Sequence, residues 1–294
     1  MSAATTKKYP WPNDARIALS MVVNVEEGSE YNITEGDRGP EPVDELQVSL
    51  SKPMRNYGNE SNYLYGIKEG APRIIKLLDK YNVSATWTVC GQSLEKYPHL
   101  ADTIKQRGDE ACSHGYRWIH QFRMKEDEER AYIRKAADSI EQTTGQRPKG
   151  WLSRYLLTDN TRRILQEEGF LYHMDDYSGD EPFWDSVTDS DEPMCILPYA
   201  MDSNDMKMWV SASFTPDDWL KYAKDTFDTL YEEGGEQTRM MSLGLHLRII
   251  GRPGRIWALE EFLRYVSSKP GVWFAQRGEI AEQFIKHNPA PEAK

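Results

Sequence analysis

The sequence predicts an α/β fold, namely a single distorted (β/α) barrel of about seven strands. Short apolar runs rich in β-branched and aromatic residues alternate with amphipathic helical patterns along the chain. Alternation of this kind indicates a parallel sheet whose strands are connected by helical crossovers. No internal repeat and no Pro/Ser-rich linker divides the chain, so we expect residues 1–294 to form one domain. A doubly wound open sheet is the alternative architecture.

Eight segments are predicted as strands because they are short, apolar and bounded by turn residues. In chain order they are 17–25, 84–89, 109–113, 150–153, 170–173, 194–198, 240–247 and 272–275. Seven segments between them repeat apolar residues with a helical period, namely 70–81, 98–107, 125–144, 159–168, 216–233, 255–267 and 279–287. Thr215-Pro216 is a helix start, and Gly145, Gly169 and Gly234 fall just past helix ends.

Two segments lie outside this alternation. Residues 1–15 are expected to form an N-terminal extension. Residues 29–62 show no clear periodicity and are expected to form a long loop. Loops of this length usually carry function or make contacts between subunits.

The charge balance excludes several classes of protein. The chain has 36 Lys and Arg against 47 Asp and Glu, a formal net charge of -11, so we expect no nucleic-acid partner and no membrane-surface role. No apolar run is long enough for a membrane span, and no nucleotide-binding glycine motif follows a strand. The N-terminal residues lack a secretory pattern and the three cysteines have no CxxC spacing, so we expect a cytoplasmic protein.

Catalytic groups of a barrel lie at the carboxyl ends of its strands. Glu26 and Glu27 end the first predicted strand, and only one of them should point inward because neighbouring strand residues face opposite sides. His114 follows the third strand within an aromatic cluster, and His246 lies near the end of a later strand. Histidine at such a position can act as a general acid or base. Arg154 ends a short strand, where it could polarise a carbonyl.

Each of these residues also has an ordinary structural interpretation. Carboxylates at strand ends are mostly solvated, and an arginine after a strand is mostly exposed. A single histidine on an apolar strand is often a core residue with its hydrogen bonds satisfied. The sequence alone leaves both interpretations open for each residue.

The order of carboxylate pair, His, Arg and His at strand ends resembles the polysaccharide deacetylase superfamily, which has a distorted (β/α) barrel. That superfamily carries T-F-D-D, then H-[ST]-x-x-H, then an Arg-containing motif and a late L-x-H. The matching segments here are Asn24-Val25-Glu26-Glu27, His114-Gly115-Tyr116-Arg117-Trp118, Arg154 and Leu245-His246, with Leu243 further back.

One departure from this pattern concerns the metal. In metal-dependent members the second Asp and the two His bind a divalent ion, and the matching positions here are Glu27, His114 and Trp118. An indole N–H is only a donor and cannot ligate a metal. His120 could take its place only if a turn intervened, because an extended segment would separate it from His114 by roughly 20 Å. We therefore expect no metal and no other cofactor.

Longer segments resemble the cofactor-independent allantoinases of bacterial urate catabolism and the related cyclic imide hydrolases. They are VNVEEGSE, CSHGYRWI, DNTRRILQEEGFLY, FWD, PYAMDSNDM and LGLHLRIIGRPGR, and the resemblance runs from about Trp11 to Pro289. It implies metal-free, ring-opening hydrolysis of a cyclic amide C–N bond by a homotetramer in purine catabolism. The third motif of the allantoinases, Gly-Trp-Tyr-Thr-Gly-Arg, differs from Gly150-Trp151-Leu152-Ser153-Arg154-Tyr155 here. The pocket wall is therefore expected to be more apolar and differently shaped, which argues against allantoin specifically and keeps simpler imides and hydantoins as candidate substrates.

The resemblance also implies roles for the candidate residues. Glu26 would be the general base, Glu27 and His114 would position the water or the substrate, and His246 would stabilise the oxyanion and protonate the leaving nitrogen. The residues expected to bind the substrate are Trp118, Arg154 and Asn204. Two other functions are kept as alternatives: a metal-dependent N-deacetylase of amino-sugar polymers, and a non-catalytic binding protein with the same fold.

Overall fold

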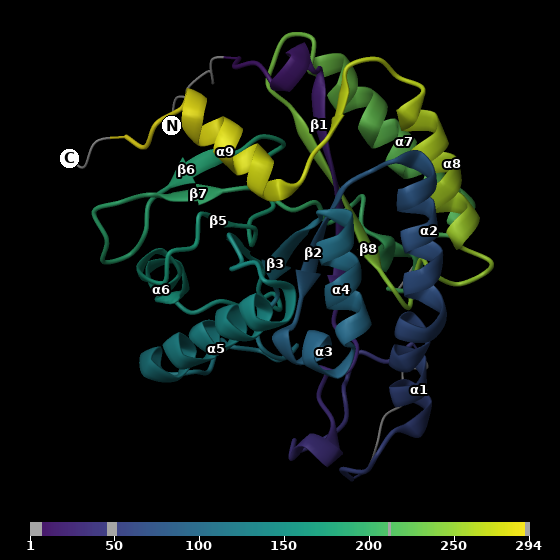
Figure 1. The fold of residues 1–294 in the computed structure, drawn as a ribbon, viewed down its shortest axis with the longest axis vertical. Coiled ribbons are helices and arrows are strands. Elements are labelled where there is room, and N and C mark those ends of the chain that lie inside the picture. Colours follow the sequence, from purple (N-terminus) through teal and green to yellow (C-terminus); the bar gives the residue numbers. More distant parts are fainter. Residues whose placement is uncertain (1–7, 46–51, 211–212, 292–294) are drawn as a thin grey trace.

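The computed structural model describes residues 8–45, 52–210 and 213–291. Within them, one curled sheet has nine strands in the order β6-β7-β5-β4-β3-β2-β1-β8, and β9 also pairs with β1 (Figure 1). Only the pairing of β6 with β7 is antiparallel. The strands are β1 (Ile17–Val25), β2 (Ala85–Val89), β3 (Glu110–Ser113), β4 (Gly150–Trp151), β5 (Tyr172–His173), β6 (Phe183–Asp185), β7 (Met194–Ile196), β8 (Met240–His246) and β9 (Val272–Phe274).

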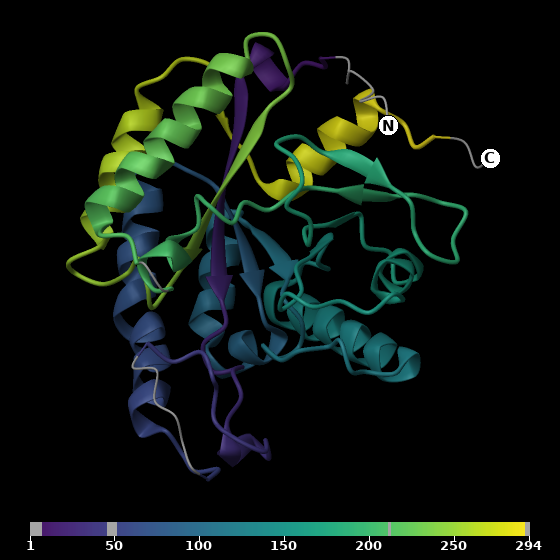
Figure 2. The ribbon, with the colours of Figure 1, turned by 180° about the vertical axis from the view of Figure 1, so that it is seen from behind.

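Helices cover the outside of this sheet. Figures 1 and 2 show α2, α7 and α8 along the side of β1 and β8, and α5 and α6 below the other half of the sheet. The helices are α1 (Tyr57–Tyr65), α2 (Ala71–Tyr81), α3 (Gly91–Lys96), α4 (Pro98–Arg107), α5 (Glu126–Thr144), α6 (Thr161–Glu167), α7 (Pro216–Glu233), α8 (Ile256–Ser267) and α9 (Arg277–His287). The sheet is therefore a half-barrel whose end strands β6 and β8 do not pair.

The predicted fold class is confirmed, and each predicted strand and helix overlaps an element of the structure. The sequence pattern missed β6, which is only three residues long, and the short helices α1 and α3. Residues 29–62, expected to be a long loop, contain the 3-10 helix Ile33–Glu35 and the start of α1.

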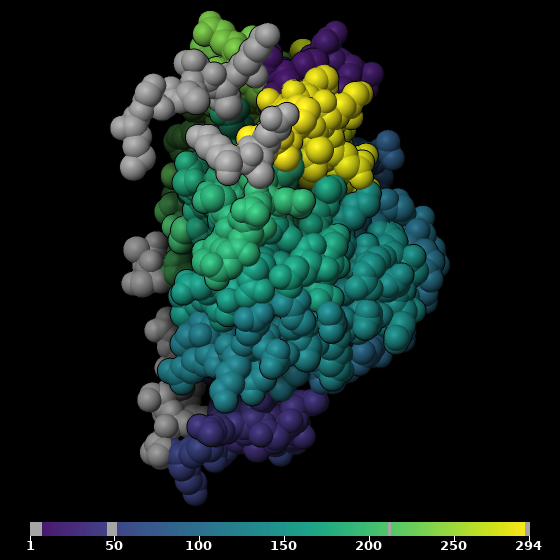
Figure 3. Space-filling model, turned by 90° about the vertical axis from the view of Figure 1, so that its left-hand side faces the viewer, coloured from purple at the N-terminus to yellow at the C-terminus, as the bar shows by residue number. Residues whose placement is uncertain are grey.

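The first residues that the structure describes pack against β9 and α9. Tyr9 and Trp11 are buried, and the ring of Tyr9 lies 6.0 Å from that of Phe284 in α9. Trp11 lies 5.6 Å from Trp273 of β9. Figure 3 shows α9 in yellow above the teal middle of the chain. The described part of the expected extension thus contributes to the core.

The central strands bring their carboxyl ends to one edge. In the parallel pairing of β1 with β8, Asn24 lies opposite His246. In the pairing of β2 with β3, Val89 lies opposite Ser113. Residues that follow these positions therefore meet at the same end of the half-barrel.

A glycine-rich contact holds a helix against this end. Between α1 and α2, residues Gly66–Gly70 form one π-helical turn, a feature frequent at functional sites. A β-carbon on Gly66 would overlap Oε1 of Glu27, and one on Gly70 would overlap the carbonyl oxygen of Leu247. Only glycine lets this helix lie directly on the turn that follows β8.

We expect Gly70→Ala to lower the free energy of unfolding by about 1–3 kcal/mol, because the backbone at Leu247 must move to admit a methyl group. Urea denaturation monitored by circular dichroism measures this change. The matched control is Gly39→Ala, where a β-carbon would meet no atom within 4 Å. Equal stability of the two variants would contradict the close contact.

Candidate active site

A small cavity of about 50 Å³ opens at the carboxyl ends of the strands. Six residues predicted from the sequence line it: Glu26, His114, Trp118, Arg154, Asn204 and His246. They come from segments up to 220 residues apart in the chain, from Glu26 to His246. The structure thus brings together all the predicted site residues except Glu27.

A larger cavity of about 310 Å³ lies beyond Tyr177 and Tyr199, which line both. Its wall contains Asp180 and Asp202 but no histidine. Because acid–base chemistry needs a paired base and acid within reach of one ligand, we place the candidate active site in the smaller cavity.

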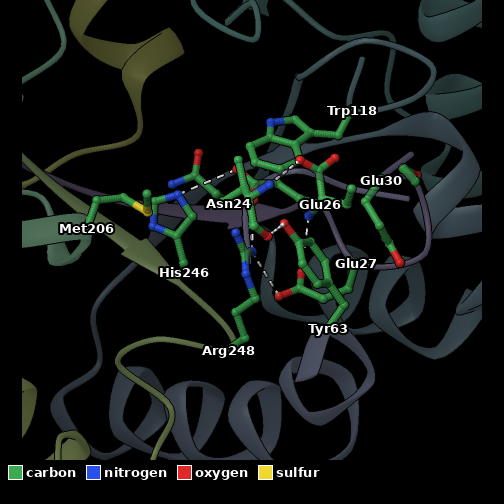
Figure 4. A network of polar contacts seen from close by, with 12 residues as sticks. Asn24, Glu26, Glu27, Glu30, Tyr63, Trp118, Met206, His246 and Arg248 are labelled. Carbon is green, nitrogen blue, oxygen red and sulfur yellow. Dashed lines mark hydrogen bonds and ion pairs between the residues drawn. The ribbon is translucent and has the colours of Figure 1, made fainter. Parts of the chain in front are cut away.

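Glu26 is the centre of this site (Figure 4). Its Oε1 lies 3.5 Å from Nε2 of His114 and 3.5 Å from Nε2 of His246. Its Oε2 lies 2.8 Å from Nη1 of Arg248. Burial opposes ionisation of Glu26, but the charges of Arg248 and His246 outweigh it and hold the pKa well below its ordinary value. Glu26 is therefore a carboxylate at neutral pH.

His114 is fixed by the backbone around it. Its Nδ1 lies 2.7 Å from the carbonyl oxygen of Leu152, and its backbone N–H donates to Val89 in β2. A carbonyl oxygen only accepts, so Nδ1 carries the hydrogen, and in the neutral ring Nε2 is an acceptor. Nε2 faces the carboxylate of Glu26 across 3.5 Å.

His246 is held by Asp205, the first residue of the 3-10 helix Asp205–Met208. Nδ1 of His246 lies 2.6 Å from Oδ1 of Asp205, and Oδ2 accepts the backbone N–H groups of His246 and Ile250. Burial would lower the pKa of His246, but the carboxylates of Asp205 and Glu26 outweigh it and raise the pKa to about 9. The ring is thus an imidazolium at neutral pH, with Nε2–H directed at Glu26.

Glu27 points away from the cavity, as expected from the alternation of side chains along β1. Its Oε2 accepts the backbone N–H of Glu26 at 3.1 Å, and its Oε1 lies 3.4 Å from Nη1 of Arg248. Burial raises the pKa of Glu27, and the attraction of Arg248 only partly offsets this. Glu27 anchors the arginine that pairs with Glu26.

The three predicted substrate-binding residues line the cavity but are held by other protein groups. Both terminal nitrogens of Arg154 bind the Glu41 carboxylate, at 2.8 and 2.6 Å, and the guanidinium lies 3.8 Å from the ring centre of Trp118. Asn204 caps the 3-10 helix through Met206 and donates to Tyr199. Arg154 therefore supports the indole, and its terminal nitrogens donate to Glu41 and to the carbonyl oxygen of Trp118.

The donor set does not fit a divalent metal ion. Trp118 offers no lone pair, and the guanidinium of Arg248 already contacts the carboxyl groups of both Glu26 and Glu27. His120 does not line the cavity; its Nδ1 lies 3.2 Å from the carbonyl oxygen of Arg154. In the part of the chain that the structure describes, no three His, Cys, Asp or Glu side chains group as a metal site.

Several residues of the site were not predicted. Arg248 lies two residues after His246, and in the sequence it was noted only as one of the arginines that follow this histidine. Asp205 adjoins the predicted Asn204 but carries no motif of its own. Tyr155 lines the cavity with φ of 62°, in the left-handed region that side-chain-bearing residues rarely adopt.

Comparison with known proteins identifies the family. The polysaccharide deacetylase family profile matches residues 62–173. A Schizosaccharomyces pombe protein assigned to the polysaccharide deacetylases is 34% identical over 299 residues, which covers 95% of this chain and 93% of that protein. The chain belongs to the polysaccharide deacetylase family.

Two solved structures are also similar over nearly the whole length. The crystal structure of PuuE allantoinase has a TM-score of 0.90 and 40% identity, and covers 95% of this chain and 93% of that one. A Pseudomonas aeruginosa structure described as a polysaccharide deacetylase has a TM-score of 0.89 and 40% identity, with 95% and 94% covered. The chain is thus a hydrolase of the deacetylase family.

In its described residues no helix has the length and apolar character of a membrane span.

The geometry predicts an unusual titration of His246. In ¹H–¹³C NMR spectra we expect its ring signal to titrate near pH 9, and in Asp205→Asn to titrate at lower pH because the main raising carboxylate is gone. Asp202→Asn is the matched control, since Asp202 contacts Ser203 and Tyr222 instead. A His246 signal that titrates at the same pH in Asp205→Asn as in the wild type would contradict the Asp205 pairing.

Proposed function

We propose that this protein is a metal-independent hydrolase that opens the ring of a small cyclic amide, such as allantoin, a hydantoin or a cyclic imide. The observation that carries the proposal is the position of the Glu26 carboxylate between Nε2 of two histidines, 3.5 Å from each. This arrangement places a base and an acid within reach of one bound ring. The whole-length similarity to an allantoinase supports the same reaction class.

The size of the cavity favours a small substrate. About 50 Å³ is far below the 300–1,000 Å³ typical of sites for drug-sized ligands. Trp118, Tyr155 and Tyr177 supply flat walls that suit a planar ring. A sugar polymer needs an extended groove, so the cavity favours a cyclic amide over an amino-sugar chain.

The proposed reaction begins with a water held between Glu26 and His114. When the ring of His114 is neutral, its Nε2 is an acceptor like Oε1 of Glu26, so one water can donate a hydrogen to each of them. Its oxygen then attacks the ring carbonyl while Glu26 takes the proton. No metal is needed to make the water nucleophilic, because a general base can do so.

His246 completes the reaction. As the C–N bond breaks, Nε2–H of the imidazolium protonates the leaving ring nitrogen. The proton taken by Glu26 then returns to His246, whose Nε2 lies 3.5 Å away. The net change is one water added across the C–N bond, which gives a carboxylic acid and a free N–H end, and the acid then releases its proton to solvent.

The proposal includes a cytosolic homotetramer with a role in purine catabolism, as the resemblance implies. Hydrolysis of an N-acetyl group from an amino-sugar polymer is a second candidate, and family membership favours it. A non-catalytic binding protein is disfavoured by the ionised base and the charged acid at one cavity.

A substrate panel tests the proposal. We expect ring opening of at least one of allantoin, hydantoin, succinimide and glutarimide, and no acetate release from an acetylated chito-oligosaccharide. Activity should persist after dialysis against EDTA, because no metal-ligand set forms among the residues that the structure describes. Loss of activity in EDTA with recovery in zinc would contradict metal independence. Acetate release without ring opening would show that the protein is a deacetylase.

We expect Glu26→Gln to lower kcat by at least about 100-fold, because the amide cannot accept the proton of the water. The matched control is Glu30→Gln, a nearby buried glutamate whose carboxylate accepts the N–H of Gly28 outside the cavity. Circular dichroism verifies that both variants fold. Near-normal turnover by Glu26→Gln would exclude Glu26 as the base.

A further inference from the structure

The hydroxyl group of Tyr199 lies at the candidate active site and has a fixed hydrogen-bonding state. It accepts a hydrogen bond from Nδ2 of Asn24 and another from Nδ2 of Asn204, each at 3.2 Å. Tyr199, Asn24 and Asn204 all line the cavity that contains Glu26 and His246. Asn24 lies in β1, two residues before Glu26, and both side chains are seen in Figure 4.

The orientation of both amides is determined by other groups. Nδ2 of Asn24 also donates to the carbonyl oxygen of Leu245, and its Oδ1 accepts from Thr88. Oδ1 of Asn204 accepts the backbone N–H of Met206. A carbonyl must accept and an N–H must donate, so neither amide can be reversed without losing a buried hydrogen bond.

Two incoming N–H groups use the acceptor capacity of the phenol oxygen, which leaves its own hydrogen to be donated elsewhere. Among the described residues the structure records no acceptor for that hydrogen. Burial raises the pKa of Tyr199, so the phenol stays protonated over the working pH range. A buried O–H without a protein acceptor is costly, so a ligand acceptor in the cavity stabilises it.

The neighbouring strand is shaped to admit this group. Gly244 of β8 lies two residues before His246, and a β-carbon there would overlap the Tyr199 hydroxyl and the Asn204 amide. An isolated bridge pairs Asn204 with Gly244. The absence of a side chain at this position thus lets the hydroxyl reach the floor of the cavity.

We propose that Tyr199 is a catalytic residue that donates its O–H to the carbonyl oxygen of the substrate, and that Asn24 and Asn204 are positioning residues that make it a donor. The inference rests on the proposed function, because it assigns the oxygen of the attacked carbonyl to Tyr199. A donor of this kind matters most when the oxygen becomes negative in the tetrahedral intermediate. Asn204 therefore acts through Tyr199, in place of the direct substrate contact expected from the sequence.

Two variants test the proposal. Tyr199→Phe removes the donor, and we expect kcat to fall by roughly 100-fold with KM nearly unchanged, as for the loss of an oxyanion donor. Asn204→Asp keeps the cap on Met206 but offers the hydroxyl an acceptor, so the O–H turns away from the substrate. We expect a similar fall in kcat although the hydroxyl is still present. The control Tyr9→Phe removes a buried hydroxyl outside the site.

The double variant Tyr199→Phe/Asn204→Asp separates this role from a general effect of the added charge. If Asn204→Asp acts through Tyr199, the double variant is no slower than Tyr199→Phe alone. Multiplicative losses of kcat, or a near-normal Tyr199→Phe, would overturn the proposal. If Tyr199→Phe does not fold, Asn204→Asp remains as the test. A normal kcat of Asn204→Asp would overturn the proposal equally.

The test distinguishes this inference from the proposed function. Ring opening by the wild type with a near-normal Tyr199→Phe would refute the Tyr199 role alone. Acetate release without ring opening would refute the cyclic amide function alone. The kcat values of Tyr199→Phe, Asn204→Asp and the double variant would then be compared for acetate release. If the wild type catalyses neither reaction, both are wrong.

Discussion

The parallel pairing of β1 with β8 determines where the candidate site lies. Because Asn24 pairs with His246, the residues two positions further along each strand, Glu26 and Arg248, leave the sheet side by side. A register change of one residue would turn Glu26 out of the cavity and Glu27 into it. The close contact between Gly70 and the backbone of Leu247 holds the segment that follows β8 in place. The chemistry therefore depends on the main-chain hydrogen bonds of these two strands.

Charge balance is the second constraint. Glu26, Glu27 and Asp205 are buried, and ionised carboxylates in such a place require compensation. Arg248 and the imidazolium of His246 provide it, and Tyr63 adds a ring face 4.2 Å from the guanidinium of Arg248. Two adjacent glutamates thus have opposite pKa shifts, lowered for Glu26 and raised for Glu27. Two protein cations, Arg248 and the imidazolium of His246, therefore lie beside the carboxylates of the site.

The sequence predicts those features of the fold and site that depend on a local pattern of apolar and polar residues. The strand ends that carry Glu26, His114 and His246 follow from apolar runs, and their meeting at one edge follows from parallel topology. The pairing of Arg154 with Glu41 could not be predicted, because 113 residues separate them and Glu41 lies in a segment without periodicity. The same applies to Asp205 and His246, whose contact requires the bridge between Asn204 and Gly244. Partners of buried charges are set by tertiary packing, which no short motif encodes.

The position of His246 also links folding to pH. A histidine whose pKa is about 9 in the folded chain and about 6.5 when unfolded stabilises the fold fully below about pH 6.5, and this stabilisation is lost as pH rises through 9. Glu26, with its lowered pKa, stabilises the fold above its unfolded pKa and loses that effect as acid protonates it. Deprotonation of His246 therefore lowers the stability of the fold at high pH, and protonation of Glu26 lowers it at low pH. Near neutral pH the protein lies between these limits, where both residues contribute to the stability of the fold.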